Sequence, residues 1–126
     1  MIRETILSPE APQPVGPYSQ AVRAGGLLFV AGQLALDKAG QPVGQNDAAH
    51  QTGAILANIA TILHAAGSSM DKVVKTTVFL TDLNDYPAMN DAYGRFFTAP
   101  FPARSTVEIS RLPTGMLIEI ECIALA

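Results

Sequence analysis

Residues 48–70 contain no Asp, Glu, Lys or Arg, and this uncharged segment constrains the fold more than any other part of the sequence. Its length would suffice to cross a bilayer, but polar side chains interrupt it throughout. These are His50, Gln51, Thr52, Asn58, Thr61, His64, Ser68 and Ser69. Apolar residues recur at the spacing of one helical face, namely Ile55, Ile59, Ile62, Leu63 and Ala66. We therefore predict a packed helix of a soluble protein from Asp47 to Ala66, capped by Asn46 or Asp47 and ended by Gly67.

The segments on both sides of this helix have the composition and alternation of strands. The predicted strands span residues 18–24, 27–31, 73–80, 104–110 and 117–125. Gly25-Gly26 is a hairpin signal between the first two strands. The continuous apolar run Leu27–Ala31 is typical of a central strand, and the Val and Thr content of residues 73–80 favours an extended conformation.

A second helix is predicted after Asp85, which can cap it, and Pro87 is tolerated in a first helical turn. Its apolar stripe consists of Met89, Ala92, Tyr93, Phe96 and Phe97. Four prolines make residues 8–17 an irregular arm, because each proline removes a backbone donor. We expect this arm to wrap over the surface of the domain.

The order strands, helix, strand, helix, strands indicates an α+β domain, with a mixed sheet and both helices on one sheet face. The chain has the usual size of one domain, so residues 1–126 are expected to form a single domain. Charged residues make up only 15% of the chain, below the average of about 25%. Because an uncovered apolar sheet face is an association surface, we expect another copy of the chain to cover the second face.

Charge and cysteine content argue against several kinds of partner. The formal net charge is −3 and the eight Lys and Arg residues are scattered, so the basic patch of a nucleic-acid binder is not expected. Cys122 is the single cysteine, which excludes an internal disulfide and disfavours a structural zinc site. The N-terminal residues lack the features of a signal peptide. We expect a cytoplasmic protein with no nucleic-acid or membrane partner.

Charged residues alternate with apolar ones in the last two predicted strands. Arg104, Thr106 and Glu108 share one face of their strand, and Glu119 and Glu121 share one face of the other. An arginine can grip a carboxylate through two hydrogen bonds, and a nearby carboxylate can move protons. Alternation alone favours a structural pair between Arg104 and Glu119 or Glu121 over a site.

A set of short motifs changes this weighting. In chain order they are Gly16-Pro17-Tyr18-Ser19-Gln20, Ala31-Gly32-Gln33, Val74–Leu80, Phe101-Pro102-Ala103-Arg104-Ser105, Arg111-Leu112-Pro113 and Ile118-Glu119-Ile120-Glu121. This ordered set resembles the RidA (YjgF/UK114-type) family over essentially the whole chain. The resemblance implies a chorismate-mutase-like fold and a homotrimer whose sheets form a central barrel, with three sites in clefts between subunits.

The resemblance also implies an activity. RidA proteins hydrolyse 2-imino acids such as 2-iminobutanoate and 2-iminopropanoate, and their enamine tautomers, to 2-keto acids and ammonia. These intermediates are released by pyridoxal-phosphate enzymes, and the hydrolysis itself requires no metal or organic cofactor. Carried over by motif, Arg104 binds the substrate carboxylate, Tyr18 lines the cleft and Glu119 holds or activates water. The residues expected to contact substrate are Arg104, Thr106, Gly32, Asn90 and Phe79.

Two positions depart from many relatives. Ala31 stands where some have serine, and Thr106 stands where many have cysteine. A cysteine nucleophile at position 106 is therefore excluded, and the expected mechanism is binding and orientation without a covalent intermediate there.

Two other functions compete with the deaminase. A non-catalytic trimer could bind small carboxylates, or act like a chaperone, with the same Arg104 cleft. The presence of Glu119 beside Arg104 in the motif set favours the enzyme, since a binder needs it less. A ribonuclease or translation inhibitor fits the acidic balance of the chain poorly.

Overall fold

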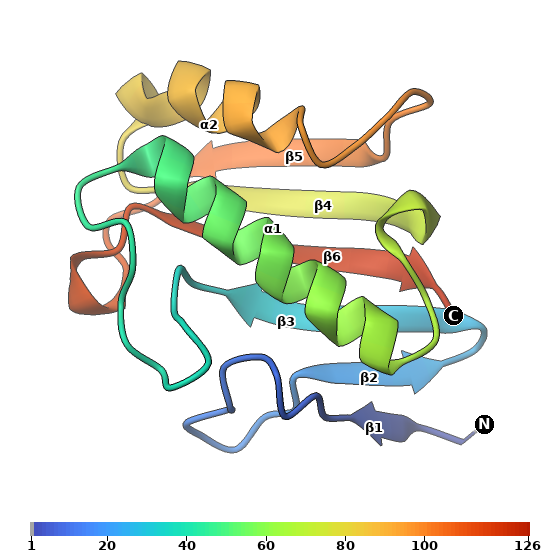
Figure 1. Cartoon of the computed structure of the whole chain (residues 1–126). Helices are drawn as coiled ribbons and strands as arrows, with labels where there is room; N and C mark the ends of the chain where they lie inside the picture. The colour runs from blue at the N-terminus through green and yellow to red at the C-terminus, as the bar shows by residue number, and fades with distance from the viewer. Residues whose placement is uncertain (1) are drawn as a thin grey trace.

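A single mixed sheet with helices on one face makes up the structure, a computed structural model that describes residues 2–126 (Figure 1). The strands are β1 (Glu4–Ile6), β2 (Ala21–Ala24), β3 (Leu27–Gln33), β4 (Val73–Leu80), β5 (Ala103–Glu108) and β6 (Ile118–Leu125). The α-helices are α1 (Ala48–Ala65) and α2 (Tyr86–Tyr93), and short 3₁₀ turns span Met70–Lys72, Leu83–Asp85 and Pro113–Gly115. The predicted α+β architecture is confirmed.

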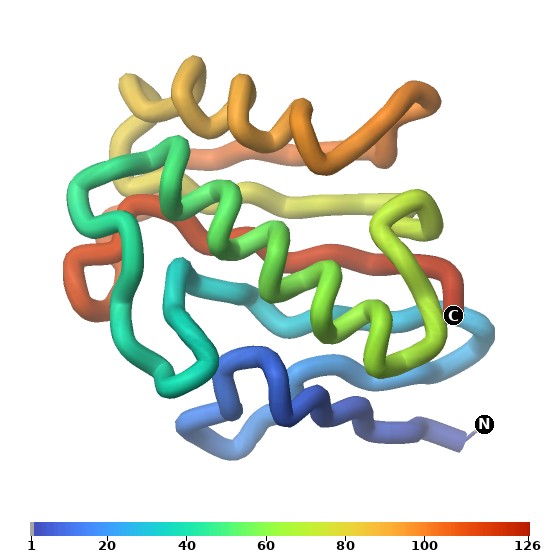
Figure 2. Tube along the Cα trace, in the orientation of Figure 1, coloured from blue at the N-terminus to red at the C-terminus, as the bar shows by residue number. Residues whose placement is uncertain are grey.

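The strand order is β1-β2-β3-β6-β4-β5. Neighbouring strands are antiparallel except β4 and β5, which are parallel and are joined through α2. Figure 2 shows α1 running obliquely across the middle of the sheet, while α2 lies along the β5 edge. The C-terminal strand β6 is therefore central, with β3 and β4 on its two sides.

The long uncharged segment forms the predicted helix. The Asp47 carboxylate accepts the His50 N–H at its start, and Gly67 adopts a positive φ of 78° just after its end. Its buried face packs against alternate residues of the sheet, among which Leu28, Ile118 and Ile120 are fully buried. No helix within residues 2–126 is long and apolar enough to cross a membrane.

Several boundaries differ from the sequence-based expectations. The first hairpin strand begins at Ala21, and β3 continues past Ala31 through an irregularity in register between Val30 and Gln33. The edge strand β1 had no sequence signal, since it is three residues long and its pairing with β2 defines it.

The second helix is shorter than its apolar stripe suggested. It ends at Tyr93, because the N–H groups of Arg95 and Phe96 donate to carbonyls three residues back and tighten the chain into a turn. Phe97 lies beyond the helix but is still buried. The Asp85 side chain makes no capping hydrogen bond, since the preceding 3₁₀ turn leads directly into the helix.

The sheet face that points away from the helices carries both apolar side chains and polar ones, the latter including Lys75, Thr77, Glu119 and Glu121. Its side chains belong to the strand residues that alternate with the core residues, and the strand register aligns them across neighbouring strands. Its apolar side chains are Leu27, Phe29, Phe79, Val107, Ile123 and Leu125. Phe29 is 43% exposed and Leu125 is 49% exposed. We call these residues the open face.

Candidate active site

Arg104 lies on the helix side of the sheet. Its register partner in β4 is Thr76, whose buried hydroxyl is hydrogen-bonded to the Tyr93 hydroxyl of α2 at 2.7 Å. The Arg104 side chain follows the same direction, and its Nη2 donates to the Tyr86 hydroxyl at 2.6 Å. The guanidinium carbon is 4.7 Å from the centroid of the Tyr93 ring. Arg104 is thus held under α2.

A cavity of about 470 Å³ opens in front of this arginine. It is lined by Asn90, Tyr93, Gly94, Phe101, Pro102 and Arg104. Among these wall residues Arg104 alone is charged, Asn90 is polar, and the others present aromatic or apolar groups. Thr106 lies on the same sheet face as Arg104, and its hydroxyl is buried with no hydrogen-bond partner within residues 2–126. Thr106 is not a wall residue of this cavity, but it lies two residues after Arg104, and an unpaired buried hydroxyl calls for a partner such as a water molecule.

Glu119 lies on the opposite side of the sheet. Its register partner in β4 is Phe79, and its neighbours Ile118 and Ile120 are buried in the core under α1. A second cavity of about 580 Å³ lies on this side. Among its wall residues are Tyr18, Gly32, Thr114, Glu119 and Glu121.

The Glu119 carboxyl group packs directly against Gly32. A Cβ atom built on Gly32 would stand 2.8 Å from Glu119 Cδ and 3.0 Å from Oε1. Burial raises the pKa of Glu119, and the charge of nearby Glu121 raises it further. A carboxyl group in this setting takes up and releases protons closer to neutral pH than an exposed one.

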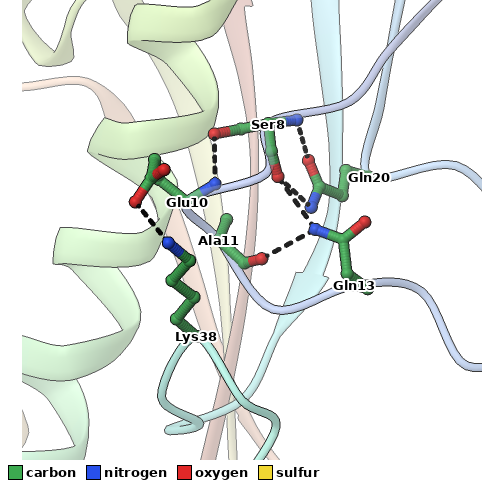
Figure 3. A network of polar contacts seen from close by, with 6 residues as sticks. All are labelled: Ser8, Glu10, Ala11, Gln13, Gln20 and Lys38. Carbon is green, nitrogen blue, oxygen red and sulfur yellow. Dashed lines mark hydrogen bonds and ion pairs between the residues drawn. The ribbon is translucent and has the colours of Figure 1, made fainter.

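Tyr18 is carried by the proline-rich arm, which buried Gln20 holds in place (Figure 3). The Ser8 N–H donates to Gln20 Oε1 at 2.7 Å, and Gln20 Nε2 donates to the carbonyls of Ser8 and Pro12. Gln13 adds hydrogen bonds to the arm from its own side chain. The Tyr18 hydroxyl accepts the Val15 N–H at 3.3 Å, so the ring position depends on the fold of the arm.

The predicted site residues therefore fall into two groups in one chain. Arg104, Asn90 and Thr106 belong to the helix side, whereas Tyr18, Gly32, Phe79 and Glu119 belong to the other side. The structural pair between Arg104 and Glu119 or Glu121, which alternation alone favours, does not form within the chain, because the sheet separates these side chains. The ion pairs among residues 2–126 are Arg23–Glu4, Lys38–Glu10 and Arg95–Asp91.

Sequence reasoning missed two tyrosines of the site. The sequence pattern gives Tyr86 no role and predicts Tyr93 only as part of the apolar stripe of the second helix. Both contact Arg104. Their spacing of two helical turns does not distinguish them by sequence, because it is equally typical of a helix face that packs on a core.

The single cysteine, Cys122, lies in the core and is a wall residue of neither cavity. Cys122 is buried, and burial raises the pKa of its thiol to about 12, which keeps it protonated. Within residues 2–126, no three His, Cys, Asp or Glu side chains are grouped so that they could hold a metal ion.

Comparison with known proteins gives a consistent set of relatives. The family model described as endoribonuclease L-PSP matches residues 8–126. A RutC family protein of Pyrococcus horikoshii is 48% identical over 123 residues, which cover 98% of each chain. Reactive Intermediate Deaminase A of Arabidopsis thaliana, a chloroplastic protein, is 43% identical over 97% of this chain and 65% of its own length. The crystal structure of a conserved Rid family protein from Yersinia pestis, 44% identical, superposes with a TM-score of 0.95 over 99% of this chain and all of the other.

Proposed function

The chain belongs to the endoribonuclease L-PSP family, which includes the Rid proteins, and we propose that it is an imine/enamine deaminase. The proposed substrates are small 2-imino acids such as 2-iminobutanoate and 2-iminopropanoate. Their hydrolysis gives 2-keto acids and ammonia. The observation that carries the proposal is Arg104, a cation in an otherwise uncharged cavity with no ion-pair partner among residues 2–126.

Arg104 suits the carboxylate that every 2-imino acid carries. A guanidinium offers a planar fork of donors that matches the two oxygens of a carboxylate. The neighbouring walls are Phe101 and Pro102, whose apolar surfaces would strengthen the attraction once a second copy covers the cavity, since Phe101 is 64% exposed in one chain. We assign Asn90 and the unpaired Thr106 hydroxyl to hydrogen bonds with the same substrate.

The reaction needs a water molecule and a proton carrier beside the imine carbon. Water adds to the protonated C=N bond, and the resulting carbinolamine expels ammonia and leaves a C=O bond. Glu119 suits the proton transfer, because its raised pKa brings its titration closer to neutral pH. We propose that Glu119 holds this water, with Tyr18 and Gly32 shaping the place where it sits.

The Arg104 cavity and the Glu119 cavity lie on opposite faces of one chain, so we propose that two copies of the chain together form each complete site. In a ring of three copies, the Arg104 cavity of one subunit would face the Glu119 cavity of the next. Such head-to-tail contacts close into a cyclic oligomer when the rotation is right. The open face supports this arrangement, since its exposed aromatic and aliphatic side chains favour burial against another copy.

A coupled assay tests the activity. Threonine dehydratase would supply the imine, semicarbazide would compete for it, and the release of 2-ketobutyrate would be followed. Wild type should accelerate ketoacid release, whereas Arg104→Ala should not. Arg95→Ala serves as the control, since Arg95 is a surface arginine with its side chain 74% exposed. Equal rates for wild type and Arg104→Ala would show that the deaminase assignment is wrong.

The main alternative is a non-catalytic protein that binds small carboxylates through the same Arg104 cavity. The two differ in their need for Glu119. Glu119→Gln should abolish turnover and leave the binding of 2-ketobutyrate largely unchanged in an enzyme. If wild type binds 2-ketobutyrate but never accelerates its release, the chain is a binder.

A further inference from the structure

The two tyrosines of α2 enclose the Arg104 guanidinium. Tyr86 opens the helix and Tyr93 closes it, two turns apart, so both side chains point from the same helix face. The guanidinium carbon lies 5.5 Å from the Tyr86 ring centroid and 4.7 Å from that of Tyr93. Both distances are within the range of cation–π attraction.

Tyr86 also holds the arginine by a hydrogen bond. Arg104 Nη2 donates to the Tyr86 hydroxyl at 2.6 Å, which is short for such a contact. A guanidinium only donates, so the phenol oxygen is the acceptor. This contact fixes one nitrogen of the fork and thereby restricts rotation of the whole plane.

Tyr93 is itself fixed from two sides. Its hydroxyl is hydrogen-bonded to the buried Thr76 hydroxyl, which belongs to the residue paired with Arg104 across β4 and β5. Its ring packs on Phe97 with centroids 4.7 Å apart. Burial raises the pKa of Tyr93, so the ring facing the arginine remains a neutral phenol.

This environment orients a cation without neutralising it. Arginine side chains are commonly held by the carboxylate of an acidic side chain. Such a side chain would compete with the carboxylate of the substrate for the same guanidinium donors. Here Arg104 is held by the aromatic rings of Tyr86 and Tyr93 and by the Tyr86 hydroxyl group. No acidic side chain within residues 2–126 forms an ion pair with Arg104. The positive charge is left for an incoming anion.

We infer that Tyr86 and Tyr93 are positioning residues that set the Arg104 fork for a carboxylate while keeping its charge available. This inference rests on the proposed function of Arg104 as the carboxylate anchor. Its consequence is that the Tyr86 hydroxyl determines substrate affinity although Tyr86 is not a wall residue of the cavity.

The test is a pair of substitutions at Tyr86. Tyr86→Phe keeps the ring and removes the hydroxyl, so KM in the coupled assay should rise about tenfold with kcat nearly unchanged, as expected for a lost hydrogen bond to a charged group. The Kd of 2-ketobutyrate, measured by calorimetry, should rise in parallel. Tyr86→Glu places an acid beside Arg104, so affinity should fall further while thermal stability is kept or increased. A purely structural role would not separate affinity from stability in this way.

Thr52→Val is the matched control, because it deletes a buried hydroxyl that donates to the Ala48 carbonyl, away from both cavities. It should lower thermal stability and leave KM and Kd unchanged. If Tyr86→Phe also leaves KM and Kd unchanged while Arg104→Ala is inactive, the inference is wrong and the proposed function stands. If Arg104→Ala retains full turnover, the proposed function fails. In that case the Kd of 2-ketobutyrate decides on the role of Tyr86. An unchanged Kd in Tyr86→Phe overturns the positioning role of Tyr86, and an increased Kd supports it.

Discussion

Arg104 and Glu119 lie on opposite faces of the same sheet, on the two strands that flank β4. Arg104 is paired in register with Thr76, and Glu119 with Phe79, three residues further along β4. Successive residues of a strand point to opposite faces, so an odd separation along β4 places the two side chains on different sides. One chain therefore presents the proposed carboxylate anchor on one side of the sheet and the proposed proton carrier on the other.

The contact between Gly32 and Glu119 gives the first prediction. Gly32→Ala adds a Cβ that would overlap the Glu119 carboxyl group, so the carboxyl group must move. We expect kcat to fall about tenfold or more, because the carboxyl group that we propose as the proton carrier would lose its alignment. The overlapped atoms are the end of a flexible side chain, so we expect only a small loss of stability, about 1 kcal/mol, measured by urea denaturation.

A double-mutant cycle identifies the cause of that loss. In a Glu119→Ala background the overlapping atoms are gone, so Gly32→Ala should cost little stability there. Gly53→Ala in α1 is the control, because a Cβ at this position meets nothing within 4 Å. It should raise stability by about 0.5–1 kcal/mol, as alanine favours helix over glycine. An equal cost of Gly32→Ala in both backgrounds would contradict the account.

The raised pKa of Glu119 makes stability depend on pH. Burial, and then the charge of Glu121, disfavour the ionised carboxyl group in the folded chain. The cost is absent below the pKa of the unfolded state, where both states are protonated, and it is complete above the raised folded pKa. Glu119→Gln should therefore be more stable than wild type at about pH 8 and equal to it at about pH 3. Denaturation curves at both pH values measure this, and a difference that does not change with pH would refute it.

Prediction from sequence succeeded where the pattern of residues within a single helix or strand is enough to identify it. The Val and Thr content of residues 73–80 predicts a strand with the observed bounds. Apolar spacing and Gly67 predict α1 to within one residue at each end. Alternation also showed which residues share a face within β5 and within β6. It does not show how the faces of two strands relate, since that depends on their register with β4. The separation of Arg104 from Glu119 therefore appeared only in the structure.

The two positioning tyrosines illustrate the same limit. Tyr86 becomes relevant only when α2 is placed over β5, which is a tertiary relationship. Its residue type and spacing alone are equally typical of a helix that packs on a core.

The open face gives a prediction about assembly. Phe29→Glu puts a charge at a position that is 43% exposed in one chain, so the fold should survive. If copies pack on this face, the buried charge should dissociate them. Light scattering should give three times the chain mass of 13.3 kDa for wild type and the chain mass for Phe29→Glu, with deaminase activity lost. Ile2→Glu, at an 89% exposed apolar residue away from this face, should change neither. A wild type that is monomeric and active would contradict a shared site.

Subunit mixing is the most direct test of that shared site. Arg104→Ala and Glu119→Gln should each be inactive alone, because every site of either oligomer lacks one group. After refolding the two variants together in equal amounts, about a quarter of all sites should combine a native Arg104 from one copy with a native Glu119 from its neighbour. Native mass spectrometry would confirm that mixed oligomers form. Recovery of about a quarter of wild-type turnover is the expected result, and mixed oligomers without any recovered activity would contradict the account.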